Sequence, residues 1–406
     1  MESVRDERHT KRRDRRALKM GVVVAASFLV SGALAGCQAV VSSSPVNETY
    51  LGSSPSSSAT TQAAKLPEKE TPQRSLERKL TVVGTGDLMI HPSIAAAAEQ
   101  WGSYAEPNFY NEISSVEKRV KASDLAVCHV ETPFSQPGVK TPFPHYYVHP
   151  NLAKAIAQVG FRECSTASNW TADKGFVGAE RTVAALKAAG VGQSGIRIPE
   201  TNPPFKIRTI KGVKVAHLSY TDPHDSPGAS EPGWAVNNGT PGEIAHQAQL
   251  AREQGAEVVI VSLAMGAMGM DSTTESQASA VKEITKHGDV NLIIGHGSHT
   301  VQPAEKVNGT WVIWHGNLIS SFFPDQRNMH VGLLSQVKLK ETSRGVFEAV
   351  SATGYPVLAR PGSGKVVDLA SSHCSPGEYD WYVSHLQQLE AKAVSQGFKL
   401  RKPCGG

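Results

Sequence analysis

The feature that most constrains this chain is a short apolar segment that ends abruptly in glycine or polar residues and recurs along the sequence. The first example, residues 81–92, reads TVVGTGDLMIHP, so a β-branched run meets Gly86-Asp87 and then His91. Segments of this kind are typical of buried parallel strands. The other examples are 125–130, 164–168, 215–220, 258–263, 290–294 and 311–314. Because open α/β sheets bind ligands at the carboxyl ends of their strands, the pattern predicts one pocket at one sheet edge.

Helical segments of about ten residues are expected between these strands. They are predicted at 94–100, 116–121, 151–159, 246–254 and 276–287. The alternation predicts an α/β fold, whereas 208–220 and 311–340 favour antiparallel additions. A mixed sheet, or two packed sheets flanked by helices, fits this pattern. The composition, 40% hydrophobic and 19% charged, provides enough apolar side chains for a large core.

The N-terminus has the parts of a secretory signal. A basic segment precedes an uncharged apolar run over 20–36, which closes in Leu34-Ala35-Gly36-Cys37. This ending resembles the lipobox of bacterial lipoproteins, in which the cysteine is lipid-modified and becomes the new N-terminus. We therefore expect a signal peptide over 1–37, with lipid attached at Cys37. The alternative is an uncleaved anchor helix with a chance cysteine, and either reading places the body outside the cytoplasmic membrane.

The remaining chain divides by composition. Residues 38–78 are rich in Ser, Thr, Pro and Ala, which predicts a disordered tether. A folded domain is expected over 79–340, followed by a C-terminal extension over 341–406 with a closing helix at 378–396. The first 20 residues carry eight Lys or Arg and four Asp or Glu, which accounts for the net charge of +4. We therefore predict no nucleic-acid partner for the body.

Four cysteines follow Cys37. An oxidising location permits disulfides. Cys374 and Cys404 flank the expected closing helix and are plausible partners. Cys128 and Cys164 fall in predicted core strands, where free buried thiols are an equal alternative.

The polar strand ends bring together residue types that bind metals. Carboxylates, an amide oxygen and imidazoles are ligands for hard or borderline cations, here Mn, Zn, Fe or Mg. Such a pocket can polarise a phosphoryl or carbonyl oxygen and activate a water. Each residue alone has a simpler reading, as a turn, a helix cap or a buried group bonded to backbone. The residues are Asp87, His91, Glu131, Asn169, Asp173, His296 and His299.

The motifs GDLMIHPSI, CHVETPFS, STASNWTADKG, AHLSYT, VIVSLAMG and LIIGHGSHTVQPAEKVNGTWVIWHGN occur in this order along the chain. In order and spacing they resemble the CapA family of poly-γ-glutamate capsule synthesis proteins, and its secreted, lipid-anchored branch in particular. The resemblance covers about residues 80–337 and implies a metallophosphoesterase-like two-sheet sandwich between helix layers (α/β/β/α). It also implies a role in making or attaching an anionic polyglutamate-type envelope polymer, alongside other capsule-synthesis proteins. The pocket it implies is formed by Asp87, Glu131, Asn169, His296 and His299.

This chain departs from the family pattern at the pocket. Trp170 stands where the family usually has a histidine, and Ala264 and Met268 stand where it has a histidine and an acidic residue. Gly297 replaces a further histidine that the family often has. Because Trp, Ala and Met cannot replace imidazole or carboxylate on a hard cation, we expect one metal or none rather than two.

Two functions remain open at this point. The first is a metal-dependent hydrolase or transferase acting on an envelope polymer. The second is a non-catalytic, lipid-anchored binding or scaffold protein whose pocket has lost its chemistry. No motif for a nucleotide cofactor is present in the sequence. In the enzyme reading, Asp87, Glu131, Asn169 and His299 hold the metal, His296 and Asp173 act as acid or base, and His91 and Trp170 contact the substrate.

Overall fold

The computed structural model describes residues 78–405 except 138–146, 174, 200–201, 223–231, 321–324 and most of 376–395. All described residues belong to one compact unit, Glu70–Gly406. The expected signal peptide, Cys37 and nearly all of the tether therefore lie outside the described residues, as does most of the expected closing helix. Among the described helices, none has the length and apolar character needed to cross a membrane.

The first sheet has nine strands and contains the start of the folded chain. Its order is β14-β13-β12-β1-β2-β3-β4, with β11 paired to β1 and β15 paired to β13. Strand β1 runs parallel to β2 and β11 and antiparallel to β12. The strands are β1 (Lys79–Leu88), β2 (Leu125–Val130), β3 (Glu163–Ser165), β4 (Gly192–Ser194), β11 (Asn317–Ile319), β12 (Val331–Ser343), β13 (Val346–Ala359), β14 (Val366–Asp368) and β15 (Phe398–Leu400).

The second sheet has six strands in the order β5-β6-β7-β8-β10-β9. The four central strands are parallel, and β5 and β9 add antiparallel edges. The antiparallel pairing predicted for 208–220 is confirmed. Within 311–340, β12 is antiparallel, β10 pairs antiparallel with β9 and parallel with β8, and β11 pairs in parallel. The strands are β5 (Phe205–Ile210), β6 (Val213–Thr221), β7 (Val258–Ala264), β8 (Leu292–His296), β9 (Glu305–Val307) and β10 (Thr310–Trp314).

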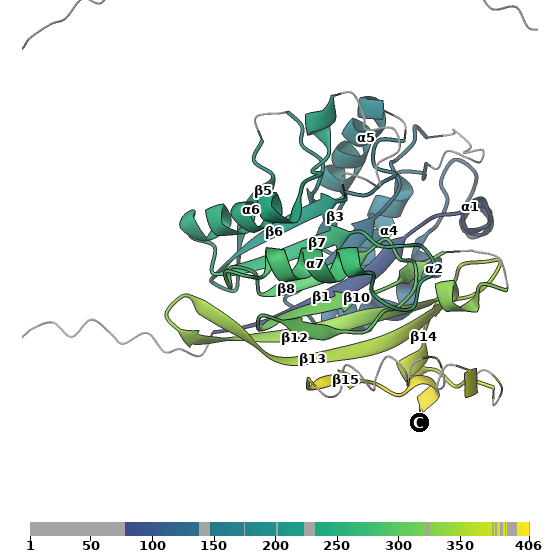
Figure 1. The fold of residues 1–406 in the computed structure, drawn as a ribbon. Coiled ribbons are helices and arrows are strands. Elements are labelled where there is room, and N and C mark those ends of the chain that lie inside the picture. The colour runs from purple at the N-terminus through teal and green to yellow at the C-terminus, as the bar shows by residue number, and fades with distance from the viewer. Residues whose placement is uncertain are drawn as a thin grey trace, which may run out of the picture. The chain divides into compact units, whose positions relative to one another are not determined.

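Helices cover the outer face of each sheet (Figure 1), and the predicted sandwich of two sheets between helix layers is confirmed. The first sheet carries α1 (Pro92–Gln100), α2 (Tyr110–Ile113), α3 (Glu117–Lys121), α4 (Asn151–Val159) and α5 (Gly175–Ala188). The second carries α6 (Pro241–Glu253) and α7 (Glu275–Ile284). Short 3₁₀ turns are η1 (Ser114–Val116), η2 (Gly233–Ala235), η3 (Arg327–His330), η4 (Leu369–Ser371) and η5 (Pro403–Gly405). Capping boxes at Thr240 and Thr274 start α6 and α7.

The space between the sheets changes from apolar to polar along the strands. On β2, Leu125 and Val127 pack into the core between the sheets, while Ala126 and Cys128 face the helices. Because side chains alternate along a strand, the next inward positions are His129 and Glu131. Strand β8 repeats this pattern, since the inward Ile294 is followed by His296. This alternation therefore places polar side chains at the carboxyl ends of β2 in the first sheet and β8 in the second.

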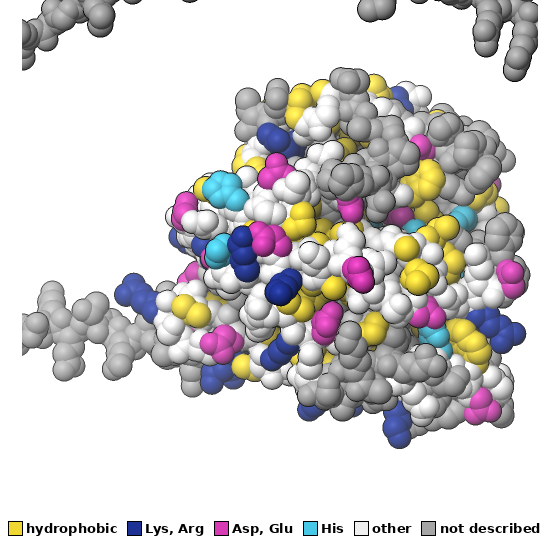
Figure 2. Space-filling view, in the orientation of Figure 1, with side chains coloured by type: hydrophobic (Ala, Val, Ile, Leu, Met, Phe, Trp, Pro, Cys, Tyr) yellow, Lys and Arg dark blue, Asp and Glu magenta, His cyan; other side chains and the backbone are white. Residues whose placement is uncertain are grey.

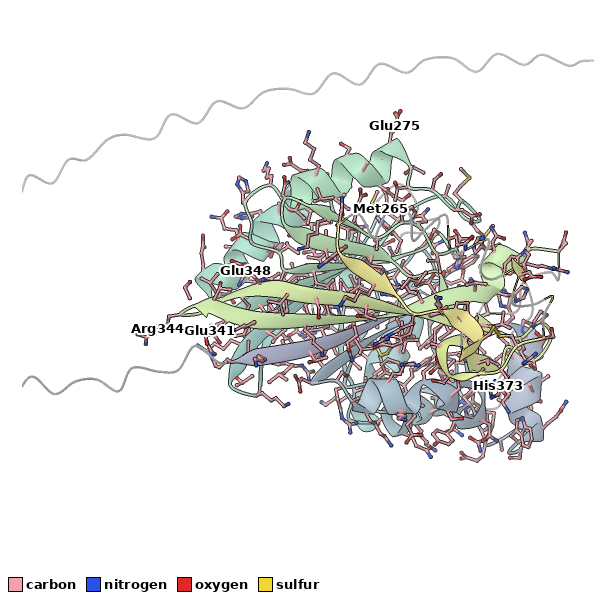
Figure 3. All side chains as sticks on the ribbon, turned by 90° about the horizontal axis from the view of Figure 1, so that it is seen from below. Met265, Glu275, Glu341, Arg344, Glu348 and His373 are labelled. Carbon is pink, nitrogen blue, oxygen red and sulfur yellow. A yellow bond between two sulfur atoms is a disulfide. The ribbon has the colours of Figure 1, made fainter. Side chains whose placement is uncertain are left out.

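The residues after 340 complete the first sheet. Strand β12 runs across the expected domain boundary at 340 and forms a long hairpin with β13. Figure 3 shows Glu341, Arg344 and Glu348 near the tip of this hairpin. Arg78, the first described residue, forms an ion pair with Glu341 and another with Glu257 at 2.7 Å, which attaches the start of the domain to both sheets.

Both pairs of cysteines are joined. Cys374 pairs with Cys404, as expected, at the C-terminal end of the chain. Cys128 pairs with Cys164 across β2 and β3, where the two residues are direct neighbours in the register. Of the two alternatives left open for Cys128 and Cys164, the structure therefore contains the disulfide.

The approach of β1 to the chain at 316–317 leaves no room for a side chain at Gly86. A Cβ there would lie 2.1 Å from the carbonyl oxygen of Gly316. We expect Gly86→Ala to lower the free energy of unfolding by about 1–3 kcal/mol, because backbone on both sides must move. Gly239→Ala is the matched control, since its Cβ would meet nothing closer than 3.4 Å. Urea unfolding followed by circular dichroism would test this, and equal stability of the two variants would contradict it.

Candidate metal centre

The carboxylate of Asp87 lies at the centre of the polar cluster between the sheets. It is completely buried, opposite Asn317 of β11 and His129 of β2 in the sheet register. One oxygen, Oδ1, lies 2.9 Å from His296 Nδ1. The other, Oδ2, accepts from the backbone N–H of Gly297 at 3.3 Å and lies 3.3 Å from His299 Nδ1. The end of β1 is thereby bound to the end of β8.

His299 is held in a fixed orientation by Asn317. Its backbone has a φ of 58°, in the left-handed region, which turns the chain directly after β8. Its Nδ1 lies 3.0 Å from Asn317 Oδ1, and the Asn317 amide donates to the carbonyl oxygens of His299 at 3.0 Å and Met329 at 2.8 Å. Asn317 is held in place by the parallel pairing of β11 with β1, in which it lies opposite Asp87. The orientation of His299 therefore depends on contacts between residues distant in sequence.

Glu131 completes a first group of potential ligands. It follows β2 directly and is buried, with Oε1 at 3.3 Å from His299 Nε2. Its second oxygen, Oε2, is buried and has no hydrogen-bond partner among the described residues. Asp87, Glu131 and His299 each offer one ligand atom, and these atoms lie within 4.8 Å of one another.

Burial and charge pull the pKa values of this group in different directions. Burial alone would raise the pKa of Asp87, but its hydrogen bonds to His296 and His299 outweigh burial and lower it. Burial raises the pKa of Glu131 to about 8. Burial also disfavours the His299 imidazolium, yet the charges of Glu131 and Asp87 prevail and raise its pKa to about 9. The metal-free group therefore retains protons that a cation would displace.

His129 belongs to the cluster but was not among the site residues predicted from the sequence. Its ring stacks on that of His296 with centroids 4.1 Å apart, and its Nδ1 lies 2.8 Å from Ser165 Oγ. Burial lowers its pKa well below the usual value, so the ring is neutral. Asp87, His129 and His296 form a second group whose ligand atoms lie within 4.8 Å of one another. Its spacing of two residues from Glu131 was the available signal, because it places both side chains on one face.

Two more residues of this region were also missed as site residues. Asn317 orients His299, as described above. His315 is buried beside His296, with ring centroids 6.3 Å apart, and its Nε2 lies 2.7 Å from Ser335 Oγ. Burial lowers the pKa of His315 to about 3. His315 lies in the connection between β10 and β11, and Asn317 is the first residue of β11, whose position follows from long-range pairing with β1.

The other predicted site residues come from the turns after β3 and from the segment before α1. Asn169, Trp170 and Asp173 are half-buried in the turns after β3. Ser168, at the start of these turns, donates to the carbonyl oxygen of Glu131 at 2.6 Å. Asp173 is in neither of the two metal-ligand groups found among the described residues. His91 precedes α1, and burial together with the charge of His299 lowers its pKa to about 4.

The residues present fit a divalent cation. Two buried atoms, Glu131 Oε2 and His296 Nε2, have no hydrogen-bond partner among the described residues, although buried polar atoms are normally paired. A cation would satisfy such atoms. The donor set of carboxylate oxygens and imidazole nitrogens suits Mn²⁺, Fe²⁺ or Zn²⁺.

Two of the positions that depart from the family pattern, Gly297 and Met268, have surroundings that differ from those of a metal ligand. Gly297 has a φ of 90°, and a Cβ there would lie 3.3 Å from the backbone nitrogen of Met265. Met265 in turn donates its N–H to the carbonyl oxygen of His296 at 3.1 Å. A histidine at 297 would thus be strained in the present backbone. Met268 is 62% exposed, so it does not fill the cluster.

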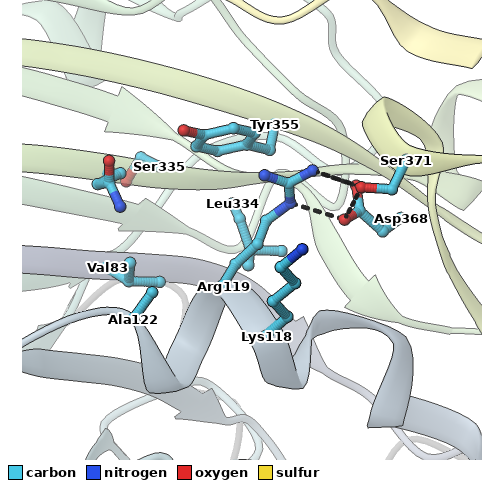
Figure 4. A pocket seen from close by; sticks show the side chains of 10 residues that line it. Val83, Lys118, Arg119, Ala122, Leu334, Ser335, Tyr355, Asp368 and Ser371 are labelled. Atoms are coloured by element: carbon cyan, nitrogen blue, oxygen red, sulfur yellow. Dashed lines mark hydrogen bonds and ion pairs between the residues drawn. The ribbon is translucent and has the colours of Figure 1, made fainter. Parts of the chain in front are cut away.

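A separate cavity of about 220 Å³ lies between α3 and strands β12 and β13. Figure 4 shows Arg119 extending across it toward Asp368 and Ser371. Its Nε lies 2.7 Å from Asp368 Oδ2, and its guanidinium stacks over Tyr355 at 4.0 Å from the ring centroid. Because this cation already has a carboxylate and an aromatic partner, we assign the cavity a structural role.

The stability of the metal-free protein should depend on pH. The pKa of His299 is raised from 6.5 to about 9, so its contribution is complete below pH 6.5 and lost as pH rises toward 9. Glu131, with its pKa raised from 4.5 to about 8, also keeps the folded state protonated where the unfolded state is not. Both effects lower stability as pH rises. The melting temperature of chelated wild-type protein should fall as pH rises from 6.5 to 9. The fall should be less steep in His299→Gln. Equal slopes of melting temperature against pH in the two proteins would contradict the prediction.

Comparison with known proteins identifies the family. Residues 81–321 match the family Bacterial capsule synthesis protein PGA_cap. The PGA biosynthesis protein CapA of Bacillus subtilis is 24% identical over 294 residues, covering 67% of this chain and 72% of that protein. A probable polyglutamine synthesis accessory protein of Mycobacterium tuberculosis is 24% identical over 208 residues, covering 48% of this chain and 54% of that protein.

Solved structures with a related arrangement are more distant. The calcineurin-like phosphoesterase YfkN from Bacillus subtilis aligns with a TM-score of 0.47 and 16% identity, covering 79% of this chain and 98% of that chain. A novel phosphatase from Mycoplasma pneumoniae aligns with a TM-score of 0.45 and 9% identity, covering 70% and 94%. We draw no functional conclusion from likeness at these scores. On the match over residues 81–321, this chain belongs to the bacterial capsule synthesis protein family PGA_cap.

Proposed function

We propose that the protein acts in the synthesis, attachment or processing of a capsule polymer of the poly-γ-glutamate type, as a metal-dependent hydrolase or transferase. Membership of the PGA_cap family supports the process. The observation that carries the chemistry is the buried group of Asp87, Glu131 and His299, in which Glu131 Oε2 has no partner among the described residues. A cation bound there would polarise a carbonyl or phosphoryl oxygen and activate a water.

The side chains around this group have distinct tasks. Asp87 is oriented by His296 and by the backbone N–H of Gly297, and His299 is oriented by Asn317. The sequence suggested His296 as an acid or base, but its burial and its bond to Asp87 favour a positioning role. Asn169 remains a proposed metal ligand, Asp173 a proposed acid or base, and His91 and Trp170 the proposed substrate contacts.

Charge explains why a cation matters for this substrate. A polyglutamate chain is a polyanion, and the carboxylates of Asp87 and Glu131 would repel it. A divalent cation would neutralise the two carboxylate charges and could itself bind a carboxylate of the polymer. On the face shown in Figure 2, the described basic and acidic side chains are intermingled over α6 and α7. We propose that the cation site recognises the polymer, with other capsule-synthesis proteins as partners.

A second function, a non-catalytic binding or scaffold protein, is favoured by one observation. Gly297 has a backbone that a histidine would strain, so the site has adapted to the loss of that imidazole. In this reading the pocket would hold the polymer without cleaving it, and half-buried Trp170 would supply contact area.

Cation binding separates these functions. The protein purified without chelator should contain at least one divalent cation per chain by elemental analysis, and Asp87→Ala/His299→Ala should contain none. Asp368→Ala/His217→Ala is the matched control, because it removes one buried carboxylate and one buried imidazole outside the cluster. We expect the control to keep its cation.

The same proteins should then be incubated with poly-γ-glutamate and the chain length of the polymer followed by size-exclusion chromatography. Shortening or transfer of the polymer by wild type and control, but not by the double variant, is the expected result. Absence of bound cation even after loading with Mn²⁺, Zn²⁺ or Mg²⁺ would contradict the enzyme. Polymer binding without turnover would then support the scaffold.

The proposed location is the outer face of the cell membrane, with a lipid anchor at Cys37. Support comes from the sequence Leu34-Ala35-Gly36-Cys37 after an apolar segment. We expect Cys37→Ser to abolish incorporation of a labelled fatty acid in a bacterial host, while Cys374→Ser keeps it. Equal labelling of the Cys37→Ser variant and the wild type would refute the anchor.

A further inference from the structure

The hairpin of β12 and β13 carries exposed basic side chains far along the strands from the metal centre. Lys338 and Lys340 are exposed on the outer face of β12, since Leu339 between them packs into the core. Lys79 of β1 lies directly opposite Lys340 in the sheet register, and Arg344 is exposed at the turn of the hairpin. None of these four cations forms an ion pair among the described residues. They are called the basic hairpin surface below.

This arrangement of charges is unfavourable in the protein alone. Like charges directly opposite each other on neighbouring strands, such as Lys79 and Lys340, repel. Glu348, opposite Lys340 on β13, is the one acidic side chain among the exposed described residues of β12 and β13. Its carboxylate accepts a hydrogen bond from the hydroxyl of Thr342 at 3.3 Å. The basic hairpin surface therefore keeps an excess of positive charge, which an anionic partner would compensate.

Two aliphatic side chains lie beside these cations. Val346 and Val350 of β13 are 49% and 59% exposed. Because Phe347 and Ala349 pack into the core, the two valines lie on the same outer face as the lysines. Cations mixed with aliphatic groups suit the surface of a bilayer, where headgroups meet the cations and the acyl boundary meets the aliphatic groups. A wholly hydrophilic polyanion would leave the two valines without a partner.

The folded chain begins beside this surface. The carbonyl oxygen of Arg78, the first described residue, accepts a hydrogen bond from the N–H of Glu341 at 2.9 Å. Its guanidinium lies over the ring of Phe347, 5.1 Å from the centroid. Residues 38–77 join this point to the proposed lipid anchor at Cys37. The chain that comes from the anchor therefore enters the domain at the β12–β13 hairpin.

We propose that the basic hairpin surface docks on the anionic headgroups of the membrane that holds the anchor. The proposal goes beyond the proposed function and uses only the location given there. Because strand residues rise about 3.3 Å each, Asp87 lies about 25 Å along β1 from Lys79. Docking at the hairpin thus leaves the carboxyl ends of the strands, and the metal centre between them, accessible to a polymer.

A fluorescent label at Val350 tests the docking. The full chain carrying Val350→Cys, labelled with the environment-sensitive dye NBD, would be reconstituted with vesicles of phosphatidylglycerol and phosphatidylcholine. The described native cysteines are joined in disulfides, and wild type serves as the labelling blank. We expect a blue shift of the emission in these vesicles and none in vesicles of phosphatidylcholine alone. Val177→Cys is the matched control, because Val177 is 50% exposed on α5, far from the hairpin in Figure 1, and its label should not shift.

Removal of charge separates lipid docking from non-specific contact. Each lysine at an anionic surface raises affinity about fivefold, so Lys338→Gln/Lys340→Gln should weaken docking about 25-fold and abolish the shift. Lys187→Gln/Lys206→Gln removes two exposed lysines from α5 and β5 and should keep the shift.

Three results would overturn the proposal: equal emission of the labels at Val350 and Val177, a shift at Val350 without phosphatidylglycerol, or a shift that survives loss of both hairpin lysines. A shift produced by free poly-γ-glutamate but not by vesicles would overturn it as well and assign the surface to the polymer. Because these variants leave Asp87, Glu131 and His299 intact, failure of docking would leave the proposed function standing.

Discussion

The rest of the structure depends on a negative charge buried between two sheets. Asp87 has no contact with solvent, and an uncompensated charge in such a place costs several kcal/mol. His296, His299 and the N–H of Gly297 compensate it from the end of β8 and the turn that follows. These partners belong to the second sheet and Asp87 to the first. The cluster therefore requires both sheets to keep one relative position, and the apolar core between them maintains it.

The same alternation that builds this core also builds the site. Inward positions on β2 and β8 are apolar along most of each strand and become polar at the carboxyl end. On β1 the register shifts between Gly84 and Asp87, so Asp87 does not follow the alternation of Leu80 and Val82. Five imidazole or carboxylate side chains meet there: Asp87, His129, Glu131, His296 and His299. Such a network contributes little to stability and is costly where atoms stay unpaired. We propose that cation binding explains its retention in a buried position, because a cation would satisfy atoms that have no partner among the described residues.

The sequence predicted those features that depend on neighbouring residues, such as the bounds of strongly apolar strands and helices. The bounds of β2 and α4 matched their predictions, since each is a strongly apolar segment with a clear end, in α4 at Gly160. Asp87, Glu131, His296 and His299 could be grouped because they end parallel strands. His129 escaped notice because it lies inside an apolar run, and Asn317 because its place depends on pairing with β1. Strand β13, buried on only part of its length, gave too weak an apolar signal to reveal that the sheet continues beyond 340.

The central claim is that a cation sits among Asp87, Glu131 and His299. Anomalous diffraction at the zinc absorption edge, from crystals of protein loaded with Zn²⁺, locates bound metal directly. The account predicts an anomalous peak in contact with all three side chains, with the His299–Glu131 contact replaced by metal bonds. Anomalous density confined to surface residues, with the direct contact between His299 and Glu131 intact, would contradict it.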